Sequence, residues 1–97
     1  MAVYVDDAFA WLTVPPFWKG GGHLQADTTA ELHAFAEGLG LRRAWFQHRA
    51  GRPWHDHYDL TAAKREQAIA AGAIAETTEQ GRARRKALRA ALDERRG

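Results

Sequence analysis

The sequence predicts a single small α/β domain with a three- to four-stranded, mainly parallel sheet, two packed helices and a third, basic C-terminal helix. Short β-favouring runs alternate with helical patterns along the chain, as in α/β proteins. The 97 residues suffice for one hydrophobic core, and 45% of them are hydrophobic, including ten aromatic residues. We place the α/β domain at residues 1–76 and a basic helical tail at residues 77–97.

The first part of the chain is expected to form two strands separated by a long loop. Residues 3–5 favour a strand, which Asp6 and Asp7 end. Two prolines and three consecutive glycines then make residues 8–22 irregular, a possible lid held by its aromatic side chains. A second strand follows at residues 23–26.

A helix is expected to begin after Thr28, because Thr28 and Glu31 have the spacing of a capping box. Apolar residues recur at helical spacing as far as Leu39, and Gly40 stands where a helix commonly ends. The apolar run at residues 44–46 predicts a third strand. Strand, helix and strand would then form a right-handed unit of parallel strands.

Three further elements are predicted in the second half of the chain. Thr61 can cap a helix over residues 62–71 that Gly72 closes, and residues 73–75 favour a last strand. Residues 80–96 favour a helix with a thin apolar stripe and seven basic residues. We expect this last helix to dock weakly on the domain or on a partner.

Composition and charge limit the class of protein. The chain has no cysteine, which excludes disulfides and thiolate metal sites. It has neither a secretory signal nor a membrane-spanning run, so we expect a cytoplasmic protein without a membrane partner. Residues 1–75 hold seven basic and eight acidic side chains, whereas residues 76–97 hold seven basic and four acidic ones. The positive excess therefore lies in the tail.

A site is expected where the strands end, because ligands of open parallel sheets bind at the carboxyl edge. The residues placed there are Asp6, Asp7, Asp27, Gln47, His48, His57, Tyr58 and Asp59. We assign catalytic roles to Asp6, Asp27, His57 and Asp59, ligand binding to Lys64, Arg65, Gln47 and Tyr58, and a divalent metal to Asp6, Asp7 and His57. The metal would polarise a phosphoryl group, or His57 would act as a general acid or base.

Structural roles compete with these assignments. Asp27 is also typical of a helix start, and Asp6 and Asp7 of a strand end. His55 and His57 would share one face of an extended segment, as a metal pair requires, yet solvated loop histidines are common. Lys64 and Arg65 are ordinary helix-surface residues by type. The loop tryptophans Trp11, Trp18 and Trp54 are candidates for stacking on a planar ring.

Several segments in order resemble one known family. They are residues 3–7, residues 26–28 with 31–33, the Trp-Phe-Gln run at 45–47, and residues 57–60 followed by Lys64-Arg65, Ala68-Ile69 and Gly72-Ala73. The chain resembles the small bacterial and phage proteins grouped as domain of unknown function 4031. The resemblance covers residues 2 to 76, with the tail outside it, and implies no activity or catalytic residue.

Two functions from different classes follow from the sequence. The first is binding of a phosphate-bearing small molecule or nucleotide at the acidic and histidine rim, with hydrolysis or transfer as its reaction. The alternative is a non-catalytic adaptor or nucleic-acid-associated module that acts through residues 80–97, whose arginines would contact phosphates or a protein partner. A folded protein whose tail serves only solubility or self-association is a third possibility.

Overall fold

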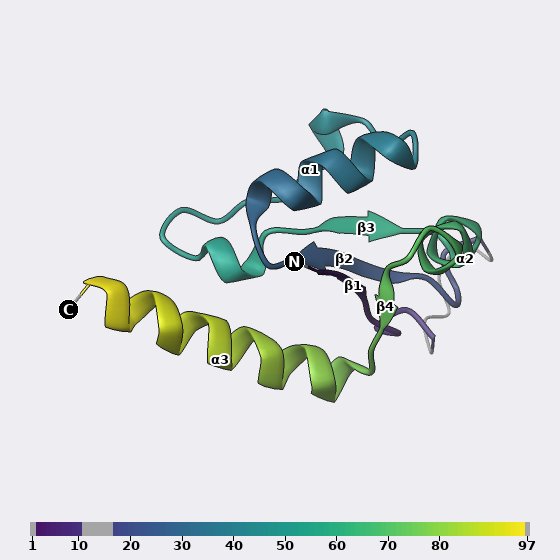
Figure 1. Ribbon diagram of the computed structural model, residues 1–97. Coiled ribbons are helices and arrows are strands. Elements are labelled where there is room, and N and C mark those ends of the chain that lie inside the picture. The colour runs from purple at the N-terminus through teal and green to yellow at the C-terminus, as the bar shows by residue number, and fades with distance from the viewer. Residues whose placement is uncertain (1, 11–16, 97) are drawn as a thin grey trace.

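The fold is described from a computed structural model that covers residues 2–10 and 17–96 (Figure 1). It contains four strands, three α-helices and two short 3-10 helices. In chain order they are β1 (Val3–Val5), β2 (Gly22–Ala26), α1 (Thr29–Gly38), η1 (Arg43–Trp45), η2 (Pro53–His55), β3 (Tyr58–Leu60), α2 (Ala62–Ala70), β4 (Ile74–Ala75) and α3 (Thr78–Arg96). The prediction of an α/β domain is confirmed.

The four strands form one mixed sheet in the order β3-β2-β1-β4. β1 pairs with β2 and β2 with β3 in antiparallel fashion, and only β1 and β4 are parallel. The prediction of a mainly parallel sheet is therefore wrong. It assumed a parallel crossover through α1, but the chain after α1 returns to pair antiparallel with β2.

The strand predicted at residues 44–46 is also absent. Arg43, Ala44 and Trp45 form η1 instead, and Gln47 makes a single antiparallel bridge with His57. The third strand is β3, where Tyr58 and Leu60 are buried on one side and Asp59 points to the other. An apolar run of three residues lacks this alternation, so it was weak evidence for a strand.

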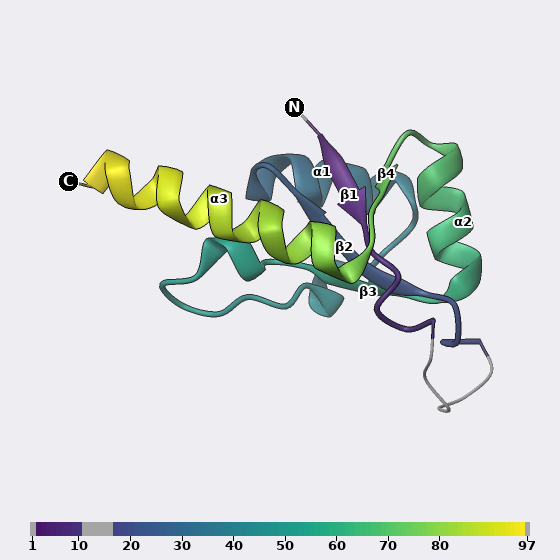
Figure 2. The ribbon, with the colours of Figure 1, turned by 90° about the horizontal axis from the view of Figure 1, so that it is seen from below.

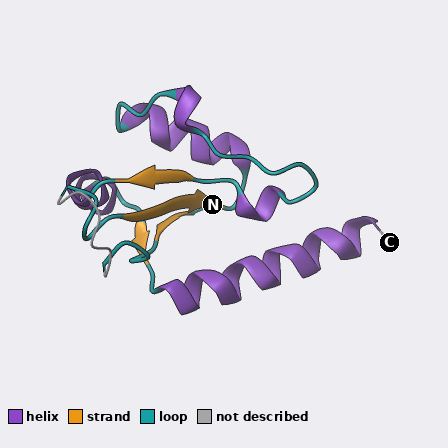
Figure 3. Ribbon diagram, turned by 180° about the vertical axis from the view of Figure 1, so that it is seen from behind, coloured by secondary structure: helices purple, strands orange, loops and turns teal. Residues whose placement is uncertain are grey.

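The sheet lies between two layers of helix (Figures 1 and 3). α1 covers one face, and α2 lies at the end of the sheet toward which β3 points. α3 crosses the opposite face, and its C-terminal half extends beyond the strands, as the view from below shows (Figure 2). α1 and α3 therefore cover opposite faces of the sheet.

The hydrophobic core fills the space between the sheet and α1. Val5, Leu24 and Leu60 point into it from the strands, and Leu32 and Ala36 meet them from α1. Successive side chains of a strand alternate between the two faces of the sheet. The residues next to Val5, Leu24 and Leu60 in the sequence therefore point to the face beneath α3. The core thus fixes which polar side chains lie on the other face.

The predicted Thr28 cap of α1 is confirmed, although Glu31 bonds to the hydroxyl of Thr28 and not to its amide as in a full capping box. The amide of Glu31 donates to Thr28 Oγ1 at 3.2 Å, and this hydroxyl donates to Glu31 Oε1 at 2.9 Å. Thr28→Ala is expected to lower the free energy of unfolding by about 1 kcal/mol, because it leaves a helix-terminal amide without its partner. Urea denaturation would measure this loss. Thr28→Ser should stay near wild type, and equal stability of both variants would contradict the prediction.

α3 is joined to the sheet by polar contacts. Its first residue, Thr78, donates from its amide and its hydroxyl to Asp7 Oδ1, both at 2.9 Å. Arg84 and Arg85 each donate to Gln25 Oε1 at 2.8 Å.

Among residues 2–10 and 17–96, no helix is both long and apolar enough to cross a bilayer.

Candidate functional site

The face of the sheet beneath α3 is lined by polar side chains. In the register of the sheet, Tyr4 lies opposite Gln25 and His23 opposite Asp59. His57 precedes Asp59 by two residues and so projects to the same side. The polar face comprises Tyr4, Asp6, His23, Gln25, His57 and Asp59.

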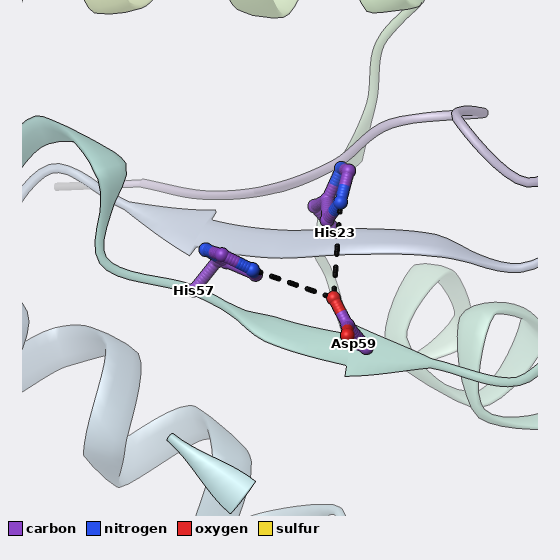
Figure 4. A group of neighbouring side chains, drawn as sticks. All are labelled: His23, His57 and Asp59. Atoms are coloured by element: carbon purple, nitrogen blue, oxygen red, sulfur yellow. Dashed lines mark ion pairs between the residues drawn. The ribbon is translucent and has the colours of Figure 1, made fainter. Parts of the chain in front are cut away.

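Three of these side chains converge on one point (Figure 4). Asp59 Oδ1 lies 3.4 Å from His57 Nε2 and 3.7 Å from His23 Nε2. One ligand atom from each of the three residues lies within 4.8 Å of the others. Tetrahedral zinc with bonds of about 2.0–2.1 Å needs ligand atoms about 3.3 Å apart, a spacing that Asp59 Oδ1 and His57 Nε2 nearly match.

Each of the three side chains is held by a second partner through its other polar atom. His23 Nδ1 contacts Asp6 Oδ2 at 3.0 Å, and His57 Nδ1 contacts the carbonyl oxygen of His55 at 2.7 Å. Gln47 Nε2 donates to Asp59 Oδ2 at 2.7 Å. Metal ligands in proteins are commonly oriented by such outer hydrogen bonds, to a carboxylate, a carbonyl or an amide.

These contacts determine which atoms remain available. Both Nδ1 atoms face oxygens that only accept, so each imidazole ring donates its Nδ1–H there, and a neutral ring then presents an Nε2 lone pair. Asp59 Oδ1 is buried and has no hydrogen-bond partner among the described residues. When both rings are neutral, two nitrogen lone pairs and this carboxylate oxygen face one another, an arrangement that a cation would stabilise.

The electrostatics of the cluster favour charged carboxylates. The neighbouring His57, aided by the amide of Gln47, lowers the pKa of Asp59 although burial opposes this. Burial alone would also raise the pKa of Asp6, but hydrogen bonds from His23 and Ala8 lower it. Burial would lower the pKa of His57, whereas the Asp59 carboxylate and the His55 carbonyl raise it.

The structure brings part of the sequence-predicted set together. Asp6, Gln47, His57 and Asp59 lie in or beside the cluster. Asp6 and His57 share this face because of strand alternation and not because the strands are parallel. The prediction that parallel strands bring them to one carboxyl edge is therefore wrong.

Other predicted residues lie elsewhere. Asp27 is at the opposite end of β2, where it accepts from the amide of Ala2 and the hydroxyl of Tyr4, both at 2.9 Å. Asp7 caps α3. Tyr58 is 1% exposed on the core side, and its hydroxyl lies 2.8 Å from His33 Nδ1. Asp27, Asp7 and Tyr58 are thus separated from the cluster.

The two basic residues of α2 make contacts with the backbone. Arg65 Nε donates to the carbonyl of Asp6 at 2.9 Å and so holds the backbone of the residue that contacts His23. Lys64 Nζ donates to the carbonyl of Leu39 at 2.6 Å, at the end of α1.

Trp11 lies outside the described residues, and the suggested lid of residues 8–22 falls partly outside them.

His23 is the cluster member that sequence reasoning missed. The signal was present, because alternation in the predicted strand 23–26 buries Leu24 and turns His23 to the other face. His57 and Asp59 are two residues apart and therefore point to one face. His55 belongs to η2 and contributes only its carbonyl, which contacts His57. Only the antiparallel pairing of β2 with β3 places His23 opposite Asp59.

The fold and the cluster define a small mixed α/β domain with histidines and carboxylates gathered on the polar face of its sheet. The chain belongs to the family described as Protein of unknown function (DUF4031), whose model matches residues 3–89. The match extends beyond residue 76, so it includes the part of α3 that contacts Gln25. No curated protein and no solved structure matches the chain significantly.

Proposed function

We propose that this domain binds a divalent metal ion through His23, His57 and Asp59 and uses it for hydrolysis or transfer on a phosphate-bearing small molecule. The observation that carries the proposal is the outer hydrogen bonding of all three side chains. It turns the two Nε2 atoms and Asp59 Oδ1 toward one point.

The donor set suits a transition metal with open positions. Two imidazoles and one carboxylate are typical of catalytic zinc and of non-haem iron, where water and substrate complete the coordination. A metal held in this way can activate water and polarise a phosphoryl oxygen. Arg85 adds a partly buried positive charge to the same face, which favours an anionic substrate.

The alternative explanation for the same geometry is a proton-mediated ion pair. In that case a protonated His57 would face Asp59 across 3.4 Å, and no metal would be needed. The two explanations differ in one measurable property, because only a metal centre binds a divalent ion with a stoichiometry of one.

Calorimetric titration of the chelator-treated protein with Zn²⁺, Co²⁺ and Mn²⁺ tests the proposal. We expect binding of one ion per chain, and visible absorption bands of the Co²⁺ form that report nitrogen and oxygen ligands. His57→Ala and Asp59→Asn should each weaken binding by more than about 100-fold, because they remove a ligand. Gln47→Ala removes only an outer contact, so a loss of about 10- to 100-fold is expected.

His55→Ala is the matched control, since it removes a nearby imidazole but keeps the carbonyl that holds His57. It should bind metal as the wild type does. Absence of a one-to-one ion in the wild type, or equal affinities of His55→Ala and His57→Ala, would reject the metal centre. Metal binding without hydrolysis of a chromogenic phosphate ester would reject only the proposed reaction.

A further inference from the structure

A pocket lies beside the cluster, along β3 at the edge of the sheet. Its volume is about 620 Å³, which is within the range of small-molecule sites. Asp59 and Gln47 form part of its wall, so a molecule in the pocket would lie next to the carboxylate of the cluster. Its other walls include Trp18, Leu41, Trp45, Thr61 and Lys64.

We propose that this pocket binds the base of a nucleotide whose phosphate is directed toward the cluster. The inference rests on the proposed function for the role of the phosphate, but binding of the base requires no metal. It assigns the substrate class as a planar aromatic ring that carries a phosphate group. The pocket provides the features that such a molecule needs.

The aromatic walls provide a surface for a planar ring. Trp45 is 51% exposed, and among the described residues its one ring interaction is with Arg42, whose guanidinium lies 5.8 Å from the ring centroid. Core packing therefore does not explain this tryptophan. Trp18 contacts Phe9 edge-on at 6.1 Å and lines the same pocket. Aromatic side chains of this kind stack on any base, because every base has a π-face.

The polar groups are few and fixed in position, as is usual in specific pockets. Lys64 Nζ is anchored to the Leu39 carbonyl at 2.6 Å and to Gln67 Oε1 at 3.3 Å, and an ammonium group has a third donor. Asp59 and Lys64 place opposite charges on the pocket wall. A base presents both donors and acceptors, which match these two groups.

Calorimetric titration with AMP, GMP, CMP, UMP and ribose 5-phosphate, in the absence of metal, tests the pocket. We expect at least one nucleoside monophosphate to bind, and to bind about tenfold or more tightly than ribose 5-phosphate. Trp45→Ala should weaken nucleotide binding by about 5- to 150-fold, the usual effect of removing a stacking side chain. Its affinity for ribose 5-phosphate should not change.

Trp54→Ala is the matched control, because Trp54 lies in η2 outside this pocket and stacks on Arg89. It should bind nucleotides like the wild type. If no nucleoside monophosphate binds, or if the Trp45→Ala and Trp54→Ala variants bind equally well, the inference is overturned. Both variants should keep the metal affinity of the wild type. Nucleotide binding without metal binding would reject the proposed function alone, and the reverse result would reject this inference alone.

Discussion

Alanine in place of Gly22 is expected to destabilise the domain by about 3 kcal/mol or more, and so to reduce the yield of folded protein sharply. A Cβ atom at this position would overlap the carbonyl oxygen of Asp6 and lie 2.8 Å from Asp6 Oδ1. The neighbour is the backbone of Asp6, directly after β1, which cannot move aside without breaking its hydrogen bond to His23. Gly22 does not have a positive φ, so the substitution is opposed by lack of space alone.

The same substitution should also disturb the cluster. The amide of His23 donates to Asp6 Oδ1 at 2.8 Å, and the amide of Asp6 donates to the His23 carbonyl at 3.2 Å. Separating the strands at Gly22 stretches both bonds. Loss of structure would be followed by circular dichroism and by the urea midpoint.

Gly38→Ala is the matched control for Gly22→Ala. Gly38 lies in the last turn of α1, and a Cβ there would meet no atom within 4 Å. Because alanine has the higher helix propensity, this variant should gain about 0.5–1 kcal/mol. Similar stabilities of the two variants would contradict the assignment of Gly22 to a close contact between strands.

Elements with local signals could be predicted from the sequence. The Thr28 cap of α1, the Thr61 cap of α2 and the glycines after both helices depend on residues a few positions apart. The direction of the strands depends instead on pairing between distant segments. A three-residue strand such as β3 carries too short an alternation to outweigh an apolar run like residues 44–46.

The candidate site likewise depends partly on local signals and partly on pairing between distant segments. His57 and Asp59 could be selected because they directly precede the predicted helix at residues 62–71, but alternation along the chain is what places them on one face. His23 could not be joined to them, since that requires the antiparallel register of β2 and β3. The triple glycine was interpreted only as a loop signal, whereas Gly21 and Gly22 allow close approach to the backbone of Leu60 and Asp6. Composition alone does not separate these two uses of glycine.

Arg84→Met is expected to lower the free energy of unfolding by about 3 kcal/mol, because it leaves a buried carboxylate unpaired. Arg84 donates to Glu76 from its Nη2 at 2.7 Å and from its Nε at 3.1 Å, and the two side chains are 16% and 8% exposed. Its guanidinium also lies 4.1 Å from the ring centroid of Tyr4. These contacts fasten α3 to the polar face of the sheet.

Two variants separate the loss of the ion pair from the loss of a positive charge. Arg82→Met removes an exposed arginine of the same helix and should change stability by less than about 0.5 kcal/mol. In the double variant Glu76→Gln, Arg84→Met, a neutral amide replaces the buried charge, so about 1 kcal/mol or more should be recovered relative to Arg84→Met. If Arg84→Met is no less stable than Arg82→Met in urea denaturation, α3 is not held by this pair. The helix would then be free to act away from the sheet, as the nucleic-acid alternative requires.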